Sequence, residues 1–204
     1  MRLLLESYRT DLHKFGLGEN KRFFTIFWVL VGIQSDRWRT TCHVTLDHKK
    51  LVTPLNYLLK AFDELTALDS MLIYQLRQQV FMLEQECLYP DIDGVDPSCS
   101  HLLGMQEKEL ISYLRIVPPG HHFKEPALGR IIVTPENRGG NLGPELIRMG
   151  IQLCRKNFPN KAISIEAQFP LQTYYEQFGF VALGPVYQVD NIPHIHMKLK
   201  AFLS

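Results

Sequence analysis

Residues 127–143 hold the pattern with the clearest chemical meaning in the chain. The apolar run 131–133 predicts a strand, 134–137 predict a turn, and 138–143 open a helical pattern that continues to about Lys156. At such a junction free backbone N–H groups and the positive end of the helix dipole converge, and glycines let a ligand approach the backbone. The pattern therefore predicts a cradle for a phosphate or pyrophosphate, although a tight turn that needs glycine only for packing would look the same.

The loop 91–96, Asp-Ile-Asp-Gly-Val-Asp, also gathers groups that could do chemistry. An EF-hand calcium loop has its glycine at the sixth position and acids at the first, third and fifth. Here the glycine is fourth and no later glutamate falls in register, so we do not expect calcium. Two interpretations stay open. Asp91 and Asp93, with Gln85 and Tyr89, line a mouth that attracts a cationic substrate, or the Asp side chains accept local N–H groups of a turn.

Hydrophobic periodicity gives the elements that must position these residues. Leu55–Phe62 predicts a first strand, and apolar residues at helical spacing predict a helix that Thr66 or Asp69 caps and that ends near Glu84. Residues 89–100 predict a loop. The other predicted elements are a hairpin (102–106 and 110–117), a loop (118–126), a strand (162–167), a short helix (170–178) ended by Gly179, and closing strands (180–187 and 195–199). This order predicts a mixed sheet with helices on both faces.

Length and composition indicate one soluble domain with an N-terminal extension. The chain has 204 residues and a net charge of +1, which gives no electrostatic reason to expect nucleic acid or a membrane as partner. Residues 1–50 carry nine Lys/Arg and five Asp/Glu, lack a sustained period and contain both tryptophans, Trp28 and Trp38. Their apolar stretch Phe23–Ile33 is too short for a bilayer, which needs roughly 20 apolar residues. We expect a poorly packed extension before a domain at 51–204; a membrane or partner anchor is the alternative.

Cysteine and histidine usage does not favour a metal site. Cys42, Cys87, Cys99 and Cys154 are scattered and form no CxxC pair, so we expect reduced thiols in a cytoplasmic protein. His194 and His196 would share one strand face, but a zinc ion there would lack further ligands nearby, so we expect no metal.

Four stretches together resemble the GNAT-type N-acetyltransferases, and more closely their ElaA-like branch. The first is Val80–Gly94, VFMLEQECLYPDIDG, which is similar to that branch's VFVVEQ…YxDIDG. The others are Gly129–Val133 with the loop that follows, Ala167-Gln168 with Tyr174–Phe180, and Ile192–Ile195. The likeness covers residues 51–200 and leaves out residues 1–50.

The resemblance implies an α/β (mixed α+β) GNAT-like fold. In that fold a mostly antiparallel sheet has a splayed central parallel pair, here the strands at 131–133 and 162–167, and helices on both faces. Acetyl-coenzyme A would be the co-substrate, with its pantetheine arm in the gap and its pyrophosphate in the cradle. The implied cofactor contacts are Ile131, Ile132, Val133, Arg138, Gly139, Gly140, Asn141, Leu142 and Gly143. Asn141 departs from the family loop Arg/Gln-x-x-Gly-x-Gly/Ala, but asparagine tolerates left-handed backbone better than most residues, so we expect the cradle to persist.

The resemblance also assigns the general acid to Tyr175. In the family, the tyrosine of Tyr-x-x-Phe-Gly-Phe protonates the departing thiolate, and Tyr175 occupies that position. A core aromatic is the alternative, and we expect the neighbouring Tyr174 to pack elsewhere. Backbone N–H groups near Val133 are candidates for polarising the thioester carbonyl.

Three residues remain candidates for the general base that deprotonates the amine. They are Glu84, His194 and, with less support, Glu166. Gln168 is expected to contact the substrate. For Arg130 we favour an ion pair with a buried carboxylate over a contact with substrate.

The sequence therefore predicts an acyl-CoA-dependent N-acyltransferase that moves acetyl to a primary amine by direct attack in a ternary complex. The acceptor would be a small-molecule or peptide amine, and the oligomeric state stays open, with a homodimer as one option. The alternative function is a non-catalytic module that senses acyl-CoA or docks a partner.

Overall fold

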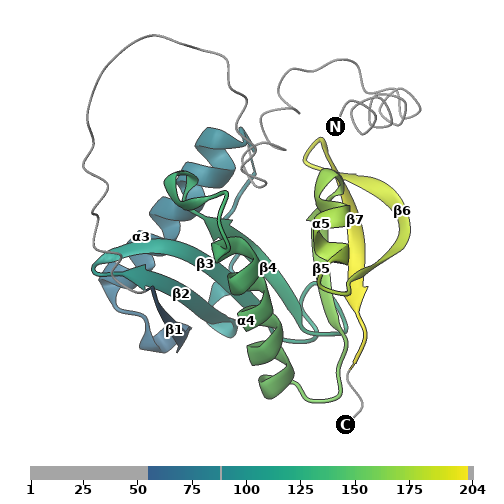
Figure 1. Cartoon of the computed structure of the whole chain (residues 1–204), viewed down its shortest axis with the longest axis horizontal. Helices are drawn as coiled ribbons and strands as arrows, with labels where there is room; N and C mark the ends of the chain where they lie inside the picture. Colours follow the sequence, from purple (N-terminus) through teal and green to yellow (C-terminus); the bar gives the residue numbers. More distant parts are fainter. Residues whose placement is uncertain (1–54, 88, 202–204) are drawn as a thin grey trace.

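The computed structural model of the chain describes residues 55–87 and 89–201 (Figure 1). The predictions for residues 1–50, including both tryptophans and Cys42, lie outside these residues. No helix of the described part is long and apolar enough to cross a membrane. Cys87, Cys99 and Cys154 are free and buried, as expected for reduced thiols.

Seven strands form one sheet in the order β1-β2-β3-β4-β5-β7-β6. The strands are β1 (Asn56–Ala61), β2 (Ser100–Gln106), β3 (Glu109–Val117), β4 (Ala127–Val133), β5 (Ile163–Gln168), β6 (Val181–Val189) and β7 (Ile192–Leu199). All neighbouring pairs are antiparallel except β4 and β5, which are parallel. The predicted mixed sheet with a central parallel pair is confirmed.

The parallel strands β4 and β5 form very little backbone pairing. Only Ala127 and Ser164 are in register across β4 and β5, and the Ser164 N–H donates to the Pro126 carbonyl at 2.9 Å. Beyond these residues the two strands diverge, toward the top of the view in Figure 1. The backbone edges of β4 and β5 beyond this point do not bond each other, so the splay predicted from the family resemblance is present.

The first helix changes its winding along its length. Thr66 caps α3 (Ala67–Arg77) in a capping box with Asp69, whose N–H donates to the Thr66 hydroxyl at 3.1 Å and whose carboxylate accepts the Thr66 N–H at 2.8 Å. The chain then continues as the π-helix η2 (Gln78–Glu84), which ends with the Gln85 N–H on the Val80 carbonyl at 3.0 Å. The predicted single helix to Glu84 is thus α-helical only to Arg77. Wide π turns often occur at functional sites.

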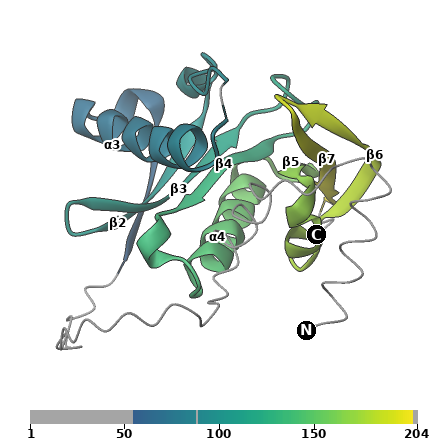
Figure 2. The same ribbon diagram turned by 90° about the horizontal axis from the view of Figure 1, so that it is seen from above.

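Two cores lie on opposite faces of the sheet, one under α3 and one under α4 (Leu142–Asn157) (Figure 2). Successive strand residues point to opposite faces, so Ile132 packs in the α3 core and Val133 in the α4 core. A Cβ on Gly150 would lie 2.6 Å from Leu114 Cδ1, so this glycine allows α4 to approach β3 closely.

The last helix is shorter than predicted. Residues 169–171 form a 3-10 turn and α5 spans only Gln172–Glu176. Gly179 follows with φ +87°, the left-handed conformation expected of a glycine that ends a helix. Burial of Leu171 and Tyr175 fixes this segment on the α4 face of the sheet.

Candidate active site

A cavity of about 580 Å³ lies where β4 and β5 diverge. Its lining comes from η2, β4, the loop before α4, β5, α5 and the β6–β7 turn. Most residues predicted for the site line it: Gln85, Tyr89, Asp93, Ile131, Ile132, Val133, Arg138, Gly139, Gly140, Gly143, Gln168, Tyr175 and His194. Among the described residues, Glu84, Asp91, Asn141 and Leu142 were predicted for the site but are not part of this lining.

β4 contains a bulge beside the cavity that the sequence did not reveal. Tyr113 pairs with Ile132 and Arg115 with Gly129, so Leu114 of β3 faces two residues of β4, Arg130 and Ile131. Arg130 has φ +51°, a left-handed conformation that costs a residue with a Cβ about 1–2 kcal/mol. A bulge leaves the extra residue unpaired and redirects the neighbouring backbone groups. The strained position holds an arginine and not a glycine, so it could not be recognised from the sequence.

The predicted cradle is open at the N-terminus of α4. Asn141 is the N-cap residue and its side chain makes no capping hydrogen bond. The left-handed position of the loop is Gly139, with φ +82°, whereas Asn141 has φ −88° and ψ −2°. Asn141 therefore needs no left-handed conformation, and its departure from the family loop costs nothing in backbone strain. A Cβ at Gly140 would meet nothing within 4 Å, which leaves the approach to the backbone clear.

The Arg138 side chain is fully engaged within the protein. Its Nε donates to the Val133 carbonyl at 2.8 Å, and its Nη1 and Nη2 donate to the two carboxylate oxygens of Glu84 at 2.8 and 3.0 Å. Both side chains are mostly buried, with 7% and 17% exposure. This guanidinium is therefore not available to an anion in the predicted cradle, where the remaining donors are backbone N–H groups. The ion pair also holds Glu84, one of the candidate bases, away from the cavity.

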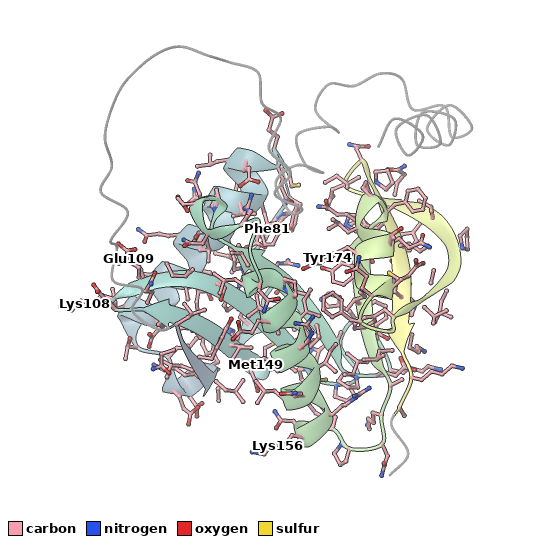
Figure 3. The ribbon with its side chains drawn as sticks, viewed as in Figure 1. Phe81, Lys108, Glu109, Met149, Lys156 and Tyr174 are labelled. Carbon is pink, nitrogen blue, oxygen red and sulfur yellow. The ribbon has the colours of Figure 1, made fainter. Side chains whose placement is uncertain are left out.

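Tyr175 lies in the cavity wall as a neutral phenol. Burial raises the pKa of Tyr175 well above its usual value, and its ring meets those of Tyr174 and Phe180 edge-on at 5.6 and 6.2 Å. Tyr174 also lines the cavity, contrary to our expectation, and its hydroxyl lies 3.0 Å from the position of a Cβ on Gly143. In Figure 3, Tyr174 comes from the α5 side and Phe81 from the α3 side.

Two further polar groups on the β5–β7 wall line the cavity, His194 and Glu166. His194 Nδ1 lies 2.9 Å from the Ile192 carbonyl, and because a carbonyl only accepts, Nδ1 is the donor of this contact; in a neutral imidazole the lone pair is then on Nε2. Glu166 accepts a 2.6 Å hydrogen bond from Tyr187, and burial together with this carboxylate raises the pKa of Tyr187. Tyr187 was not singled out from the sequence, because it reaches Glu166 from a different strand.

His196, the other histidine of β7, does not line the cavity. His196 stacks on Phe123 with ring centroids 4.5 Å apart, and its Nε2 lies 3.2 Å from the Ser164 hydroxyl. Within residues 55–87 and 89–201 no group of three or more His, Cys, Asp or Glu side chains is arranged to hold a metal ion.

A hydrogen bond between two glutamine side chains links β5 to the segment that follows η2. Gln168, at the end of β5, donates to Gln85 Oε1 at 3.2 Å. The Gln168 Oε1 atom is buried and has no hydrogen-bond partner among the described residues. A buried acceptor in a cavity wall is a candidate contact for a bound ligand.

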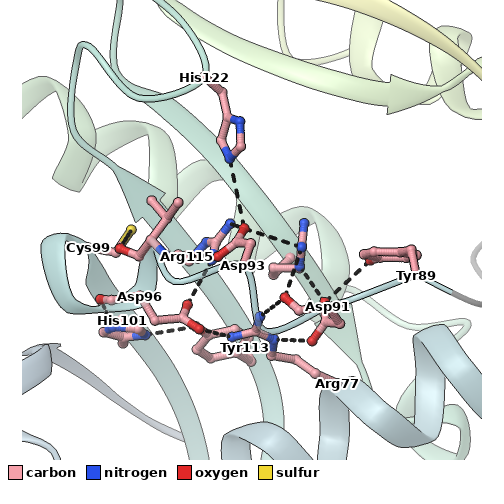
Figure 4. A network of polar contacts seen from close by, with 12 residues as sticks. Arg77, Tyr89, Asp91, Asp93, Asp96, Cys99, His101, Tyr113, Arg115 and His122 are labelled. Atoms are coloured by element: carbon pink, nitrogen blue, oxygen red, sulfur yellow. Dashed lines mark hydrogen bonds and ion pairs between the residues drawn. The ribbon is translucent and has the colours of Figure 1, made fainter. Parts of the chain in front are cut away.

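The acidic loop forms an internal ion network (Figure 4). Arg77 donates to Asp91 and Asp96 at 2.7 and 2.8 Å. Arg115 donates to Asp93 and Asp96 at 2.7–2.8 Å. Burial alone would raise the pKa of Asp93, but hydrogen bonds from Arg115 and the Val95 N–H outweigh it, so the pKa lies well below its usual value. The interpretation of this loop as an acid-lined mouth therefore loses its basis, since three arginines neutralise the three acids.

The third arginine is Arg130, whose Nε donates to Asp91 at 2.6 Å. The ion pair expected for it is confirmed. Asp93 also accepts the Val95 N–H at 3.1 Å, as the turn interpretation required. The roles of Arg77 and Arg115 were missed because they lie on α3 and β3, and only the fold brings them to the loop.

Fold and site together define a class of protein. The acetyltransferase (GNAT) domain family matches residues 71–201, and the chain belongs to this family. Protein ElaA of Escherichia coli K12 is 38% identical over 136 residues, which are 66% of this chain and 89% of ElaA. Its crystal structure superposes with a TM-score of 0.68 at 34% identity, covering 72% of this chain and all of that one. The resemblance to the ElaA-like branch is thus confirmed.

Other solved structures agree. An acyl-CoA N-acyltransferase from Pseudomonas aeruginosa superposes with a TM-score of 0.69 at 34% identity, covering 72% of this chain and 99% of that one. An aminoglycoside 6'-N-acetyltransferase complexed with coenzyme A shares the fold at 14% identity, with a TM-score of 0.54 and coverage of 69% and 95%.

Proposed function

We propose that the protein is an acyl-CoA-dependent N-acyltransferase that transfers acetyl from acetyl-CoA to a primary amine by direct attack in a ternary complex. One observation carries the proposal. The diverging strands β4 and β5 enclose a cavity that has an uncapped helix N-terminus in its lining and also contains Tyr175 and His194. A thioester, a phosphate-bearing handle and an amine need these groups in one connected space.

The lining residues fit coenzyme A. The backbone N–H groups of residues 139–143 and the α4 dipole would hold the pyrophosphate, and Gly140 leaves the approach clear. The edges of β4 and β5 beyond Ala127 and Ser164 do not pair with each other, so backbone groups on these edges, other than the Val133 carbonyl that accepts from Arg138, would bond the pantetheine amides. Bound acetyl-CoA supplies the activated acyl group; the protein supplies position and proton transfer.

Tyr175 would act as the general acid. When the amine attacks the thioester carbon, the C–N bond forms, the C–S bond breaks and the leaving sulfur carries the electron pair. A phenol whose pKa is raised by burial remains protonated and can donate its proton to that sulfur.

His194 is the general base that we propose. The Nδ1 contact with the Ile192 carbonyl leaves Nε2 as a proton acceptor in the cavity wall. Glu84 is a weaker candidate because both its oxygens bond Arg138. Glu166 also lines the cavity, but one of its oxygens accepts from Tyr187.

The charges of the lining favour a cationic acceptor. Arg115 and Arg130 are paired with the acids of the 91–96 loop, and Arg138 is paired with Glu84. Glu166 and Asp190 add negative charge to the same lining without such pairing among the interactions of the described residues. We therefore expect the acceptor amine to arrive protonated near the β5–β7 wall, with Gln168 of β5 and with Gln85 and Tyr89 of the segment after η2 as its contacts.

A turnover screen tests the proposal. Purified protein is incubated with acetyl-CoA and pooled amines or peptides, and thiol release is followed against a no-amine control. Amine-dependent thiol release and an acetylated product support the proposal. A raised melting temperature with acetyl-CoA, without any thiol release across the panel, would instead support the non-catalytic acyl-CoA sensor.

A further inference from the structure

In β4 the left-handed conformation falls on Arg130 and not on the neighbouring Gly129, which could adopt it without strain. Arg130 has φ +51° in the middle of the strand, while the adjacent Gly129 keeps a negative φ. Glycine would adopt the left-handed conformation without a steric penalty, whereas arginine does not. A conformation of this kind persists only when the surrounding structure holds it.

The Arg130 side chain is held at several points. Its Nε donates to Asp91 Oδ1 at 2.6 Å, and its Nη2 donates to the Asp91 carbonyl at 3.1 Å and to Asp93 Oδ2 at 3.5 Å. The guanidinium also lies over the rings of Phe81 and Tyr89, 5.7 and 5.5 Å from their centroids.

Asp91, which holds the Arg130 side chain, is itself held in place. Asp91 is 7% exposed, and the fully buried Arg77 donates to its other carboxylate oxygen and to its carbonyl, both at 2.7 Å. Figure 4 shows Asp91 between Arg77 on α3 and the ring of Tyr89. Arg130 is therefore tied to a group that cannot move without breaking a second buried ion pair.

We propose that the Asp91–Arg130 pair positions the β4 bulge: it holds Arg130 in the left-handed conformation and so aims the backbone of residues 130 and 131 at the cavity. Gly129, Arg130 and Ile131 all line that cavity. The acidic loop of this chain thus serves the site through β4 rather than by touching substrate. In the reaction proposed above, on which this role rests, the bulge amides would polarise the thioester carbonyl.

The test separates the side chain from the backbone conformation. Arg130→Ala removes the anchor and keeps the steric penalty of positive φ, so the bulge relaxes toward regular pairing. Arg130→Gly also removes the anchor but lets the backbone keep its conformation. We expect R130A to lower kcat about tenfold or more with little change in the KM for acetyl-CoA, and R130G to stay within about threefold of the unaltered protein.

Glu107 supplies the matched control. It has φ +55° in the exposed β2–β3 turn, far from the residues that line the cavity. E107A and E107G should both leave kcat unchanged, because glycine at positive φ there alters stability alone. If R130A does not fold, Arg130→Met, which keeps a long side chain but not the ion pair, replaces it in the comparison with R130G.

A readout without substrate separates this proposal from the proposed function. Amide hydrogen exchange of residues 129–133 should change in R130A and match the unaltered protein in R130G, whether or not any amine is acetylated. Equal losses of kcat in R130A and R130G, with a raised KM for the amine and unchanged exchange, would overturn the proposal and make Arg130 a substrate contact. Absence of acetyl-CoA turnover in the unaltered protein would overturn the proposed function while leaving the exchange result decisive for the bulge.

Discussion

Two loops of this protein carry the most suggestive residue types, and the fold uses them in opposite ways. In the loop 91–96 every acid is bonded to an arginine, so the charges cancel inside the protein. In the loop 138–143 the one charged side chain is taken up by Glu84, and the backbone at the start of α4 is left without a capping side chain. The comparison teaches that an available donor, rather than a charged residue, marks where a ligand can bind.

The strongest test of this contrast removes a buried member of the ion network. Arg115→Ala should destabilise the protein by about 3–5 kcal/mol, because it leaves Asp93 and the 2% exposed Asp96 short of a partner. Urea unfolding followed by circular dichroism measures the change. Lys60→Ala breaks the more exposed pair with Asp69 and should cost under about 1 kcal/mol. Similar losses in both variants would contradict the assignment of the network to structure.

The next test concerns the two tyrosines of the cavity wall. Tyr175→Phe should lower kcat by about 10²–10⁴-fold with a nearly unchanged KM for acetyl-CoA, because it removes the proton donor and keeps the packing. Tyr174→Phe is the control, since it removes the hydroxyl near Gly143 and spares the proposed acid. Steady-state kinetics with a cognate amine decides, and full activity in Y175F would exclude the acid role.

A smaller effect is expected from the ion pair between Glu84 and Arg138. Glu84→Gln should weaken coenzyme A binding about tenfold, because Arg138 loses its charged partner and the cradle loses an anchor. Isothermal titration with coenzyme A measures this directly. Glu136→Gln, an exposed neutralisation just before the cradle, should leave the affinity unchanged. If E84Q keeps the affinity but abolishes turnover, Glu84 is the base after all.

The smallest effect is expected when the pH is lowered. The pKa values of Asp93 and Asp96 are lowered in the folded protein, so the unfolded chain binds more protons as the pH falls. The network's stabilisation should be complete above the unfolded pKa of about 4 and decline below it. Urea midpoints measured from neutral to about pH 3 should show this loss. Asp93→Asn should flatten the acid limb, and an unchanged slope would argue against the network as its source.

Much of the fold could be predicted from the sequence, because its signals are local. Periodic apolar residues, the Thr66 cap and Gly179 place most elements within a few residues of their observed bounds. The resemblance pointed to the loop 138–143 and to Tyr175 through contiguous stretches of sequence, and most of these residues line one cavity. The π winding of Gln78–Glu84 was not foreseen, because the apolar spacing of this segment indicated one continuous helix.

What the sequence by itself determined is thus the order of elements, the family and the residues of single motifs. The tertiary structure decided which polar groups of distant segments pair. Arg77 and Arg115 pair with the acidic loop, Glu84 pairs with Arg138, and Tyr187 bonds Glu166. It also decided that Arg130 takes the left-handed position in β4. The physical reason is that pairing and strain depend on which groups meet in space, and residues up to 83 positions apart are hydrogen-bonded here.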